Sequence, residues 1–342
     1  MPDSCRLQFL PEHGIIHAER RRFMKQKQFL TNTWIVAALA LFSCILWGSA
    51  FPCVKTGYAL FGIRSSEWAE QLLFGGIRFA IAGVMVLLFG SIRERKPMIP
   101  RRQTIPKIGI ISLFQTIIQY FCYYIGLAHT SGVKASVLVG TNVFMAIFIA
   151  AFLRLESLTA RKIIGSVIGF AGLVLINLGG LREGLSFNFL GDGMILLCTV
   201  ASGCSSACMK KLAANENPVL LSGWQFFFGG AVLSLIGFAG GGRISGFTPE
   251  STCLLLYLAF ISAAAYSVWA MLLKANPVSK VAVFGFTNPM FGVLLSAILL
   301  HEWNQINGSF VIALVLVCAG IITVNLAPHH PAAERLDGSS NS

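Results

Sequence analysis

The chain has 342 residues, of which 55% are hydrophobic and only 12% are charged, and its mean hydropathy is +0.73. A soluble globular domain carries about 25% charged residues. The apolar residues form blocks of about 20 residues, a length that matches the ~30 Å hydrocarbon core of a bilayer. This composition argues against a soluble enzyme, a secreted domain and a nucleic-acid-binding protein, and it predicts an all-α integral membrane protein.

Ten apolar blocks have the length of a membrane-spanning helix. They cover residues 34–54, 71–90, 108–127, 134–153, 160–178, 189–209, 219–239, 254–273, 280–300 and 308–327. The net charge is +12, and the positive charge lies largely in the short gaps between blocks: thirteen Lys or Arg lie in or beside the gaps after the second, fourth, sixth and eighth blocks, and five lie in or beside the other gaps. The positive-inside rule places the more basic set of gaps, and both termini, in the cytoplasm. We therefore expect a basic cytoplasmic tail over residues 1–33 and a disordered cytoplasmic tail over 328–342.

Cysteine is frequent, with nine residues, but all except Cys5 lie in or beside the apolar blocks. Such cysteines are most simply buried free thiols. Cys204 and Cys208 are one helical turn apart, but no His or further Cys is near them in sequence. We therefore expect no metal site and no cofactor.

An internal repeat becomes visible when the chain is shifted against itself. At an offset of 146, Lys134, Tyr120, Thr141, Asn142 and Glu156 fall on Lys280, Tyr266, Thr287, Asn288 and Glu302. The offset is 147 for Phe79 and Gly83 against Phe226 and Gly230, and 148 for Ala171-Gly172 against Ala319-Gly320. Polar residues are rare in membrane spans, so the matches of Thr, Asn and Glu at the single offset of 146 indicate a duplication, and the small drift of the offset fits loop insertions.

The two copies are predicted to be five-helix units, over residues 34–178 and 189–327, joined by a linker over 179–188. Because five is an odd number, the second unit must lie upside down relative to the first. Inverted repeats of this kind are common in secondary transporters, which bind substrate near the membrane midplane between the repeats.

Several short motifs also resemble a known family. Trp47-Gly48-Ser49-Ala50-Phe51 ends the first block, Arg78-Phe79 lies in the second, and the fourth closes on Glu156. With the five-helix duplication, these residues resemble the EamA-type branch of the drug/metabolite transporter superfamily over residues 34 to 327. The resemblance implies a ten-helix carrier of small metabolites, many members being exporters of amino acids or related compounds. Two departures are Val143, where a proline is often found, and Ser202-Gly203-Cys204 in place of the Trp-Gly motif.

Polar residues at mid-depth are the candidates for contact with a substrate. Asn142 and Asn288, with their neighbours Thr141 and Thr287, lie near the midplane and would approach each other across an inverted repeat. The alternative is that each asparagine hydrogen-bonds a neighbouring helix. Pro289 cannot donate to the helix ladder, so we also expect a free carbonyl near Gly285.

Arg78 is the only formally charged residue well inside a block, and its repeat partner is Gln225. It would either bind a substrate carboxylate or serve as a structural anchor. Trp47, Tyr120 and Tyr266 are deep aromatic residues that would offer ring faces and hydroxyls to a solute. Packing alone is the alternative for these three residues.

None of the 14 Asp and Glu residues falls in the middle third of a block, and Glu156 and Glu302 lie at block ends. The blocks therefore contain no carboxylate at mid-depth that could carry a coupled proton, and we expect facilitated export or exchange. Proton coupling through Glu156 or Glu302 at the membrane surface is the alternative.

Together these observations predict a secondary transporter rather than an enzyme, located in the cytoplasmic membrane of a bacterium. The expected substrate is an amino acid or a related compound, moved outward by alternating access. Exchange or import of purine, sulfonium or sugar phosphate compounds is the alternative, and a channel is a remote one. The expected partners are the small-molecule substrate and the lipid bilayer, with no nucleic acid, and the chain is expected to be a monomer or a homodimer.

Overall fold

A computed structural model describes residues 28–64, 66–130, 138–176, 178, 187–299 and 308–326. Helices make up the regular structure of this described part, and no strand occurs in it. Residues 28–31, at the end of the predicted tail, form a helical turn. Lys134, Glu302, most of the predicted linker, residues 1–27 of the first predicted tail and the whole second tail lie outside the described residues.

Seven helices in the described part are long and apolar enough to span a membrane, with 18 to 29 residues each. They are α2 (Thr33–Phe61), α3 (Trp68–Glu94), α4 with η1 and α5 (Ile105–Ser112, Leu113–Ile118 and Gln119–His129), η2 with α10 (Phe189–Gly193 and Met194–Leu212), α11 (Pro218–Ala239), α12 (Pro249–Ala275) and α15 (Gly308–Asn325). The predicted class, an all-α integral membrane protein, is confirmed at this level.

The other three predicted blocks are helical too, but their described helices are shorter or interrupted. They contain α7 (Asn142–Phe152), α8 (Ala160–Ile176), and the series α13 (Val278–Ala282), η3 (Val283–Phe286) and α14 (Thr287–Leu299). The last series is interrupted next to Pro289, which has no N–H to donate to the carbonyl of Gly285. The chain there winds as the 3-10 turn η3, and the Thr287 N–H faces the carbonyls of Phe284 and Gly285.

Helix boundaries follow local sequence signals. The Asn32 side chain accepts from the Trp34 N–H at the start of α2, and Gly62, with φ of 70°, ends that helix in the left-handed conformation. Asn217 precedes Pro218 at the start of α11, and its side chain accepts from the Val219 N–H. Both starts use a polar side chain to satisfy an N–H that the first turn leaves unpaired.

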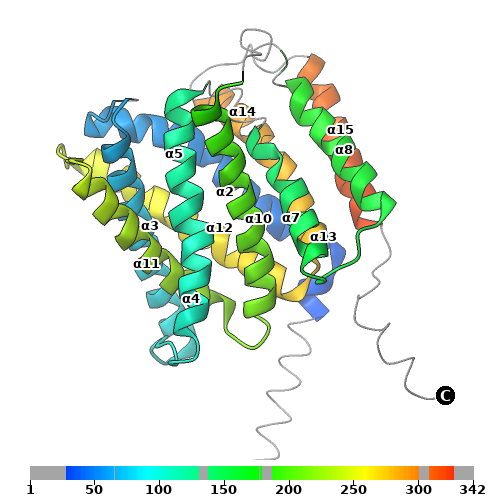
Figure 1. The fold of residues 1–342 in the computed structure, drawn as a ribbon, viewed down its shortest axis with the longest axis horizontal. Coiled ribbons are helices and arrows are strands. Elements are labelled where there is room, and N and C mark those ends of the chain that lie inside the picture. The colour runs from blue at the N-terminus through cyan, green and yellow to red at the C-terminus, as the bar shows by residue number, and fades with distance from the viewer. Residues whose placement is uncertain are drawn as a thin grey trace, which may run out of the picture.

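Glycines bring α3 and α11 into close contact at one edge of the molecule (Figure 1). A Cβ on Gly230 would lie 2.6 Å from the carbonyl oxygen of Gly76, and a Cβ on Gly83 would lie 2.7 Å from that of Gly223. As the residue number rises along α3, the residue number of the contact on α11 falls, so the two helices are antiparallel. Small residues allow this close approach of backbones.

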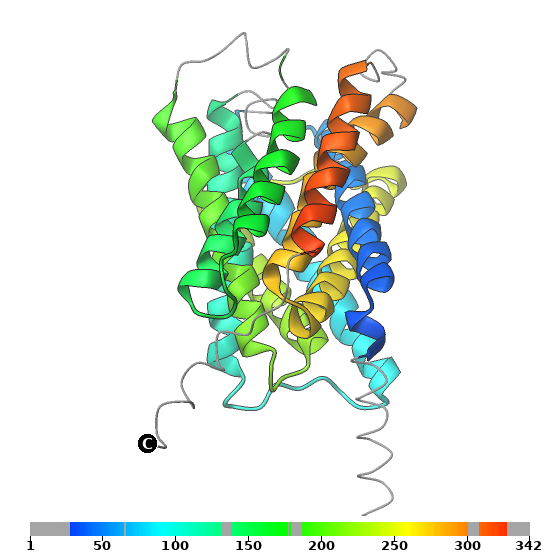
Figure 2. The same cartoon turned by 90° about the vertical axis from the view of Figure 1, so that its right-hand side faces the viewer.

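A second glycine contact pairs α8 with α15 at the opposite edge (Figures 1 and 2). A Cβ on Gly165 would lie 2.8 Å from the carbonyl oxygen of Gly320, and a Cβ on Gly172 would lie 2.8 Å from that of Ala313. These two helices are antiparallel by the same argument. The other helices fill the space between the two edge pairs (Figure 1).

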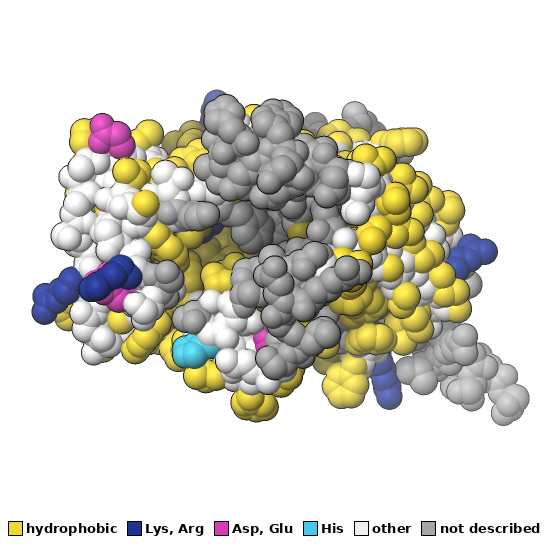
Figure 3. Space-filling model, turned by 90° about the horizontal axis from the view of Figure 1, so that it is seen from above, with side chains coloured by type: hydrophobic (Ala, Val, Ile, Leu, Met, Phe, Trp, Pro, Cys, Tyr) yellow, Lys and Arg dark blue, Asp and Glu magenta, His cyan; other side chains and the backbone are white. Residues whose placement is uncertain are grey.

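The two ends of the bundle differ in charge. The lower end in Figure 1, where the described chain begins, carries the basic end of α3 and the connection from α3 to α4, with Arg93, Arg95, Lys96, Arg101 and Arg102. The described part of the upper face is largely uncharged (Figure 3). At the lower end the hydrogen bond from Lys107 to Glu216, at 2.7 Å, holds the pKa of the Glu216 carboxyl below its usual range.

The packing predicts that Gly230→Ala destabilises the protein, because the new methyl group would overlap with the backbone nitrogen of Ala80. Overpacking of this kind costs about 1–3 kcal/mol of unfolding free energy. Thermal unfolding in detergent, followed by tryptophan fluorescence, measures the loss. Gly109→Ala is the matched control, because a Cβ there meets nothing within 4 Å and alanine is the better helix former. Equal melting temperatures for the two variants would contradict the close approach of α3 and α11.

Candidate functional site

A cavity of about 730 Å³ lies between the edge pairs. Its walls come from α2, α3, η1, α5, α7, α10, α12 and the segment α13–η3–α14, whereas α8, α11 and α15 contribute no lining residue. The lining mixes tyrosine and tryptophan rings with amides and hydroxyls. Seen from above, the described face is hollowed in its middle and lined there by apolar side chains (Figure 3).

Six of the nine residues proposed from sequence line this cavity. They are Trp47, Arg78, Tyr120, Asn142, Tyr266 and Asn288. Gln225, Thr141 and Thr287 are absent from the lining.

The three absent residues are engaged elsewhere. Gln225 lies on α11, and its Oε1 accepts from the Thr116 hydroxyl at 2.7 Å. The hydroxyls of Thr141 and Thr287 donate to the carbonyls of Leu138 and Phe284, each at 2.7 Å, within their own helical turns. The repeat offset places a residue along its helix, but it does not determine the direction in which the side chain points.

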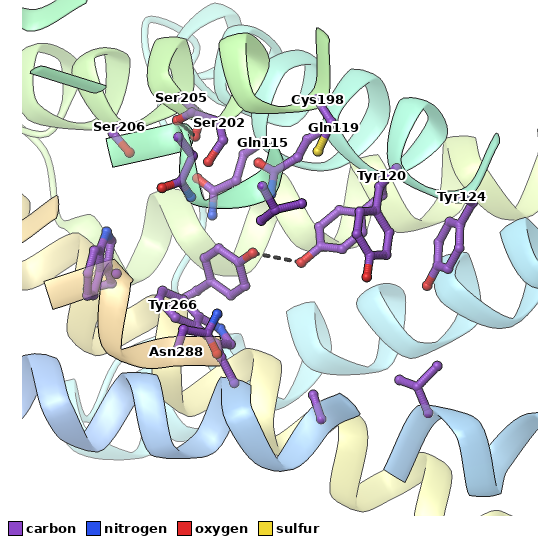
Figure 4. Close-up of a pocket in the computed structure, with 18 of the residues that line it drawn as sticks. Gln115, Gln119, Tyr120, Tyr124, Cys198, Ser202, Ser205, Ser206, Tyr266 and Asn288 are labelled. Carbon is purple, nitrogen blue, oxygen red and sulfur yellow. Dashed lines mark hydrogen bonds between the residues drawn. The ribbon is translucent and has the colours of Figure 1, made fainter. Parts of the chain in front are cut away.

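The two repeat-equivalent tyrosines meet at the cavity wall. The hydroxyls of Tyr120 and Tyr266 are 2.7 Å apart and hydrogen-bonded (Figure 4). Behind them the equivalent rings of Phe79 and Phe226 stack with centroids 5.4 Å apart and planes inclined by 6°. Two pairs of residues matched by sequence offset are thus in direct contact.

Arg78 is both anchored and part of the cavity wall. Its Nε donates to the carbonyl of Leu258 and to the hydroxyl of Ser262 on α12, each at 3.1 Å. Its guanidinium lies 5.3 Å from the centroid of the Phe79 ring, within the range of a cation–π contact. The residue is 5% exposed and belongs to the cavity lining. The structural role left open by the sequence is therefore present, and the side chain still faces the cavity.

Three buried polar atoms of the described cavity wall have no hydrogen-bond partner. They are Oδ1 of Asn288, Nε1 of Trp47 and the hydroxyl of Tyr58. An unsatisfied buried group costs about 1–3 kcal/mol, which a bound molecule with complementary groups would recover. The Trp47 ring packs against Tyr266 and Trp269, with centroid distances of 4.9 and 5.0 Å.

The second asparagine, Asn142, lies beside the interrupted segment. Its Oδ1 is 3.8 Å from the position that a Cβ on Gly285 would occupy. Gly285 belongs to η3, just before Asn288 on α14. Asn142 on α7 therefore lies beside η3, the turn that directly precedes the helix carrying Asn288.

Sequence reasoning missed a polar wall made of glutamines and serines. Gln115 and Gln119 reach the cavity from η1 and α5, and Ser202, Ser205 and Ser206 reach it from α10, whereas Asn288 lies on the other side (Figure 4). A signal was available, because residues 115 and 119 are four apart, and so are 202 and 206, a spacing that puts each pair on one helix face. The π-helical turn η1 is the part that the sequence does not reveal.

Charge in the cavity wall is sparse. Among the lining residues that the structure describes, Arg78 is the only one with a formal charge, and no carboxylate or lysine is present. The wall therefore suits a neutral, zwitterionic or singly anionic molecule better than a polycation.

Comparison with known proteins identifies the family. The sequence profile of the EamA-like transporter family matches residues 34–178 and, a second time, residues 189–326. These matches cover most of the chain, so the protein belongs to the EamA-like transporter family, and the resemblance seen in its motifs is confirmed.

Relatives of this chain are named as transporters. The uncharacterized transporter YvbV of Bacillus subtilis is 27% identical over 84% of this chain and 91% of its own length. The uncharacterized inner membrane transporter YedA of Escherichia coli K12 is 25% identical over 82% of this chain and 90% of its own. One solved crystal structure shares the fold, with a TM-score of 0.70 at 18% identity, covering 85% of this chain and 96% of that one. The protein is a multi-pass membrane transporter.

The tyrosine contact predicts energetic coupling between Tyr120 and Tyr266. Replacing one by Phe leaves the other hydroxyl without this partner, whereas replacing both removes the pair. We expect the double variant to be more stable than the sum of the single effects by about 0.5–1.5 kcal/mol. A double-mutant cycle of unfolding free energies in detergent measures this, and strict additivity would contradict a formed hydrogen bond.

Proposed function

We propose that the chain is a ten-helix secondary transporter built from two inverted five-helix units, residues 34–178 and 189–327, that works by alternating access. The glycine contacts support this architecture. At the repeat offset of 147, Gly76 corresponds to Gly223 and Gly83 to Gly230. Gly76 contacts Gly230 while Gly83 contacts Gly223, and this reciprocal pattern is the signature of a two-fold axis.

The second edge pair follows the same rule. At an offset of 148, Gly165 corresponds to Ala313 and Gly172 to Gly320. Gly165 contacts Gly320 while Gly172 contacts Ala313. Both pairs are antiparallel, as an axis lying in the membrane plane requires. The two separate matches to one family profile support the same duplication.

The proposed orientation places the basic lower end, and with it both termini, in the cytoplasm of a bacterial cell. This orientation follows from the positive-inside rule. The substrate cavity then lies between the two units, where inverted-repeat transporters bind their substrates.

The proposed substrate is an amino acid or a related compound, and the proposed direction is export. The observation that carries this proposal is a cavity with one cationic side chain, Arg78, and no described carboxylate. A guanidinium binds a substrate carboxylate well. The unpaired Oδ1 of Asn288 would accept from an ammonium group, and the rings of Trp47 and Trp269 would receive an apolar side chain.

A sulfonium or purine compound is the second candidate, because Trp47, Tyr266 and Trp269 form an aromatic cluster that suits a cation or a planar ring. Sugar phosphates fit less well, since a phosphate calls for more than one basic group. Lack of a carboxylate in the described wall favours uncoupled export or exchange over proton coupling through the cavity.

Counterflow in proteoliposomes tests this function. Purified protein is loaded in turn with unlabelled amino acids, nucleosides, sulfonium compounds and sugar phosphates, with the matching labelled solute outside. We expect transient accumulation of a labelled amino acid. Accumulation of a solute of another class would show that the substrate belongs to that class. Single-channel currents without counterflow would show that the protein is a channel and not a carrier.

The cavity geometry predicts that Asn288→Ala and Asn142→Ala lower counterflow at least about tenfold, because each removes a polar group that a bound solute would use. A tenfold loss corresponds to about 1.4 kcal/mol. Asn325→Ala is the matched control, since the Asn325 side chain donates to the carbonyl of Ile321 on α15, away from the cavity. Normal counterflow in both cavity variants would show that neither asparagine contributes to substrate binding.

Arg78→Lys is expected to impair transport as well, because lysine lacks the Nε that bonds Leu258 and Ser262 and lacks the planar fork. Ser262→Ala, which keeps the guanidinium, should have a smaller effect. Counterflow together with thermal unfolding separates lost binding from lost anchoring. Wild-type transport by Arg78→Lys would exclude both roles.

A further inference from the structure

A buried ion pair joins the end of α7 to α8 and to the start of α13. Oε2 of Glu156 accepts from Lys162 Nζ at 2.9 Å and from the Ser279 hydroxyl at 2.6 Å, and Oε1 accepts from the Ser279 backbone N–H at 2.9 Å. The Lys162 and Glu156 side chains are 4% and 7% exposed. An ion pair buried to this degree is costly to break on one side only, because the remaining charge loses its partner.

The pair holds an element that forms part of the cavity wall. Ser279 belongs to α13, and the segment α13–η3–α14 continues from it to Ala282, Gly285 and Asn288, all of which line the cavity. A shift of α13 relative to α7 would therefore be transmitted to the cavity wall. Figure 1 shows α13 beside the lower end of α7.

At the lower end of the bundle, buried side chains close the cavity and form its floor. Met209, Leu273 and Ala282 line the cavity next to the lower-end connections and are only 1%, 2% and 7% exposed. Ser279 lies one helical turn below Ala282. The contacts of Glu156 thus hold the chain directly beneath the floor.

The sequence repeat does not reproduce the donors of this cluster. At an offset of 146, Glu156 corresponds to Glu302, but Ser279 corresponds to Val133 and Lys162 to Gly308. At the offset of 148, Lys162 would correspond to Phe310. At the offset of 146, an apolar residue and a glycine thus stand where Ser279 and Lys162 bind Glu156, so the sequence repeat does not predict the same cluster at the other end.

We propose that Glu156 is a positioning residue of the transport cycle: its contacts with Lys162 and Ser279 clamp the lower end of the cavity shut, and their release opens it on that side. This inference rests on the proposed function, since only an alternating-access carrier needs such an opening. A purely structural role for Glu156 would make the same contacts, but their loss would then lower stability without changing access to the cavity.

Access to the cavity floor can be measured without knowing the substrate. Ala282→Cys is introduced into the full chain, and a membrane-impermeant maleimide is applied to inside-out and to right-side-out membrane vesicles. Labelling at position 282 is followed by peptide mass spectrometry, so the native cysteines can stay. We expect slow labelling from the lower-end side, and at least about tenfold faster labelling when Glu156→Gln is added.

Glu216→Gln is the matched control. Glu216 is also an ion-paired acid at the lower end, bonded to Lys107 at 2.7 Å, but Lys107 lies on α4 and neither residue lines the cavity. Its loss should leave labelling at position 282 unchanged. An equal rise in this control would overturn the proposal, because any disturbance of the lower end would then suffice.

Glu156→Gln combined with Lys162→Met removes both charges and leaves no unpaired ion, so it guards against a folding defect in the single variant. It should show the same faster labelling. Unchanged labelling in this double variant, with wild-type thermal stability, would overturn the clamp. The proposed function is judged separately, because it fails only if the wild-type protein shows no counterflow of any solute.

Discussion

Close backbone contact at glycine is the constraint on which the remaining structure depends. Inside a bilayer, apolar side chains gain little by leaving lipid for protein, so helices associate through van der Waals packing and a few polar contacts. The α3–α11 and α8–α15 pairs meet this requirement with glycines whose missing Cβ atoms let carbonyls approach to contact distance. These two rigid edges hold the other helices between them and leave a cavity in the middle.

The cavity has to keep polar groups stable at membrane depth. Arg78 meets this demand through two hydrogen bonds to α12 and a ring face beneath its guanidinium. The hydroxyls of Tyr120 and Tyr266 form a hydrogen bond with each other. Asn288 and Trp47 each keep a polar atom without a partner, which matches the needs of a carrier, since a site that satisfied all its own groups would gain nothing from a solute.

Some contacts in the structure follow the sequence repeat, and others depart from it. The reciprocal glycine contacts and the paired tyrosines follow the repeat, and they fit two units that rock about a common centre. Glu156 departs from it, because at the offset of 146 Val133 and Gly308 stand in place of its donors Ser279 and Lys162. In the proposed transport cycle, the buried ion pair of Glu156 and Lys162 would favour the state that is closed at the lower end.

The sequence by itself determined the membrane class, the family and six of the residues that line the cavity. Apolar block length, the rarity of polar residues in lipid and the repeat offset are all properties of residue type and position along the chain. Only the tertiary structure decided which side chains turn inward. Gln225 was expected to match Arg78, but α11 packs behind α3 and its glutamine bonds Thr116 instead. Gln115 and Ser202 line the cavity because of the way their helices are rotated. The Glu156 cluster forms because folding brings distant segments together. Sequence spacing alone encodes neither arrangement, because both depend on which helices become neighbours.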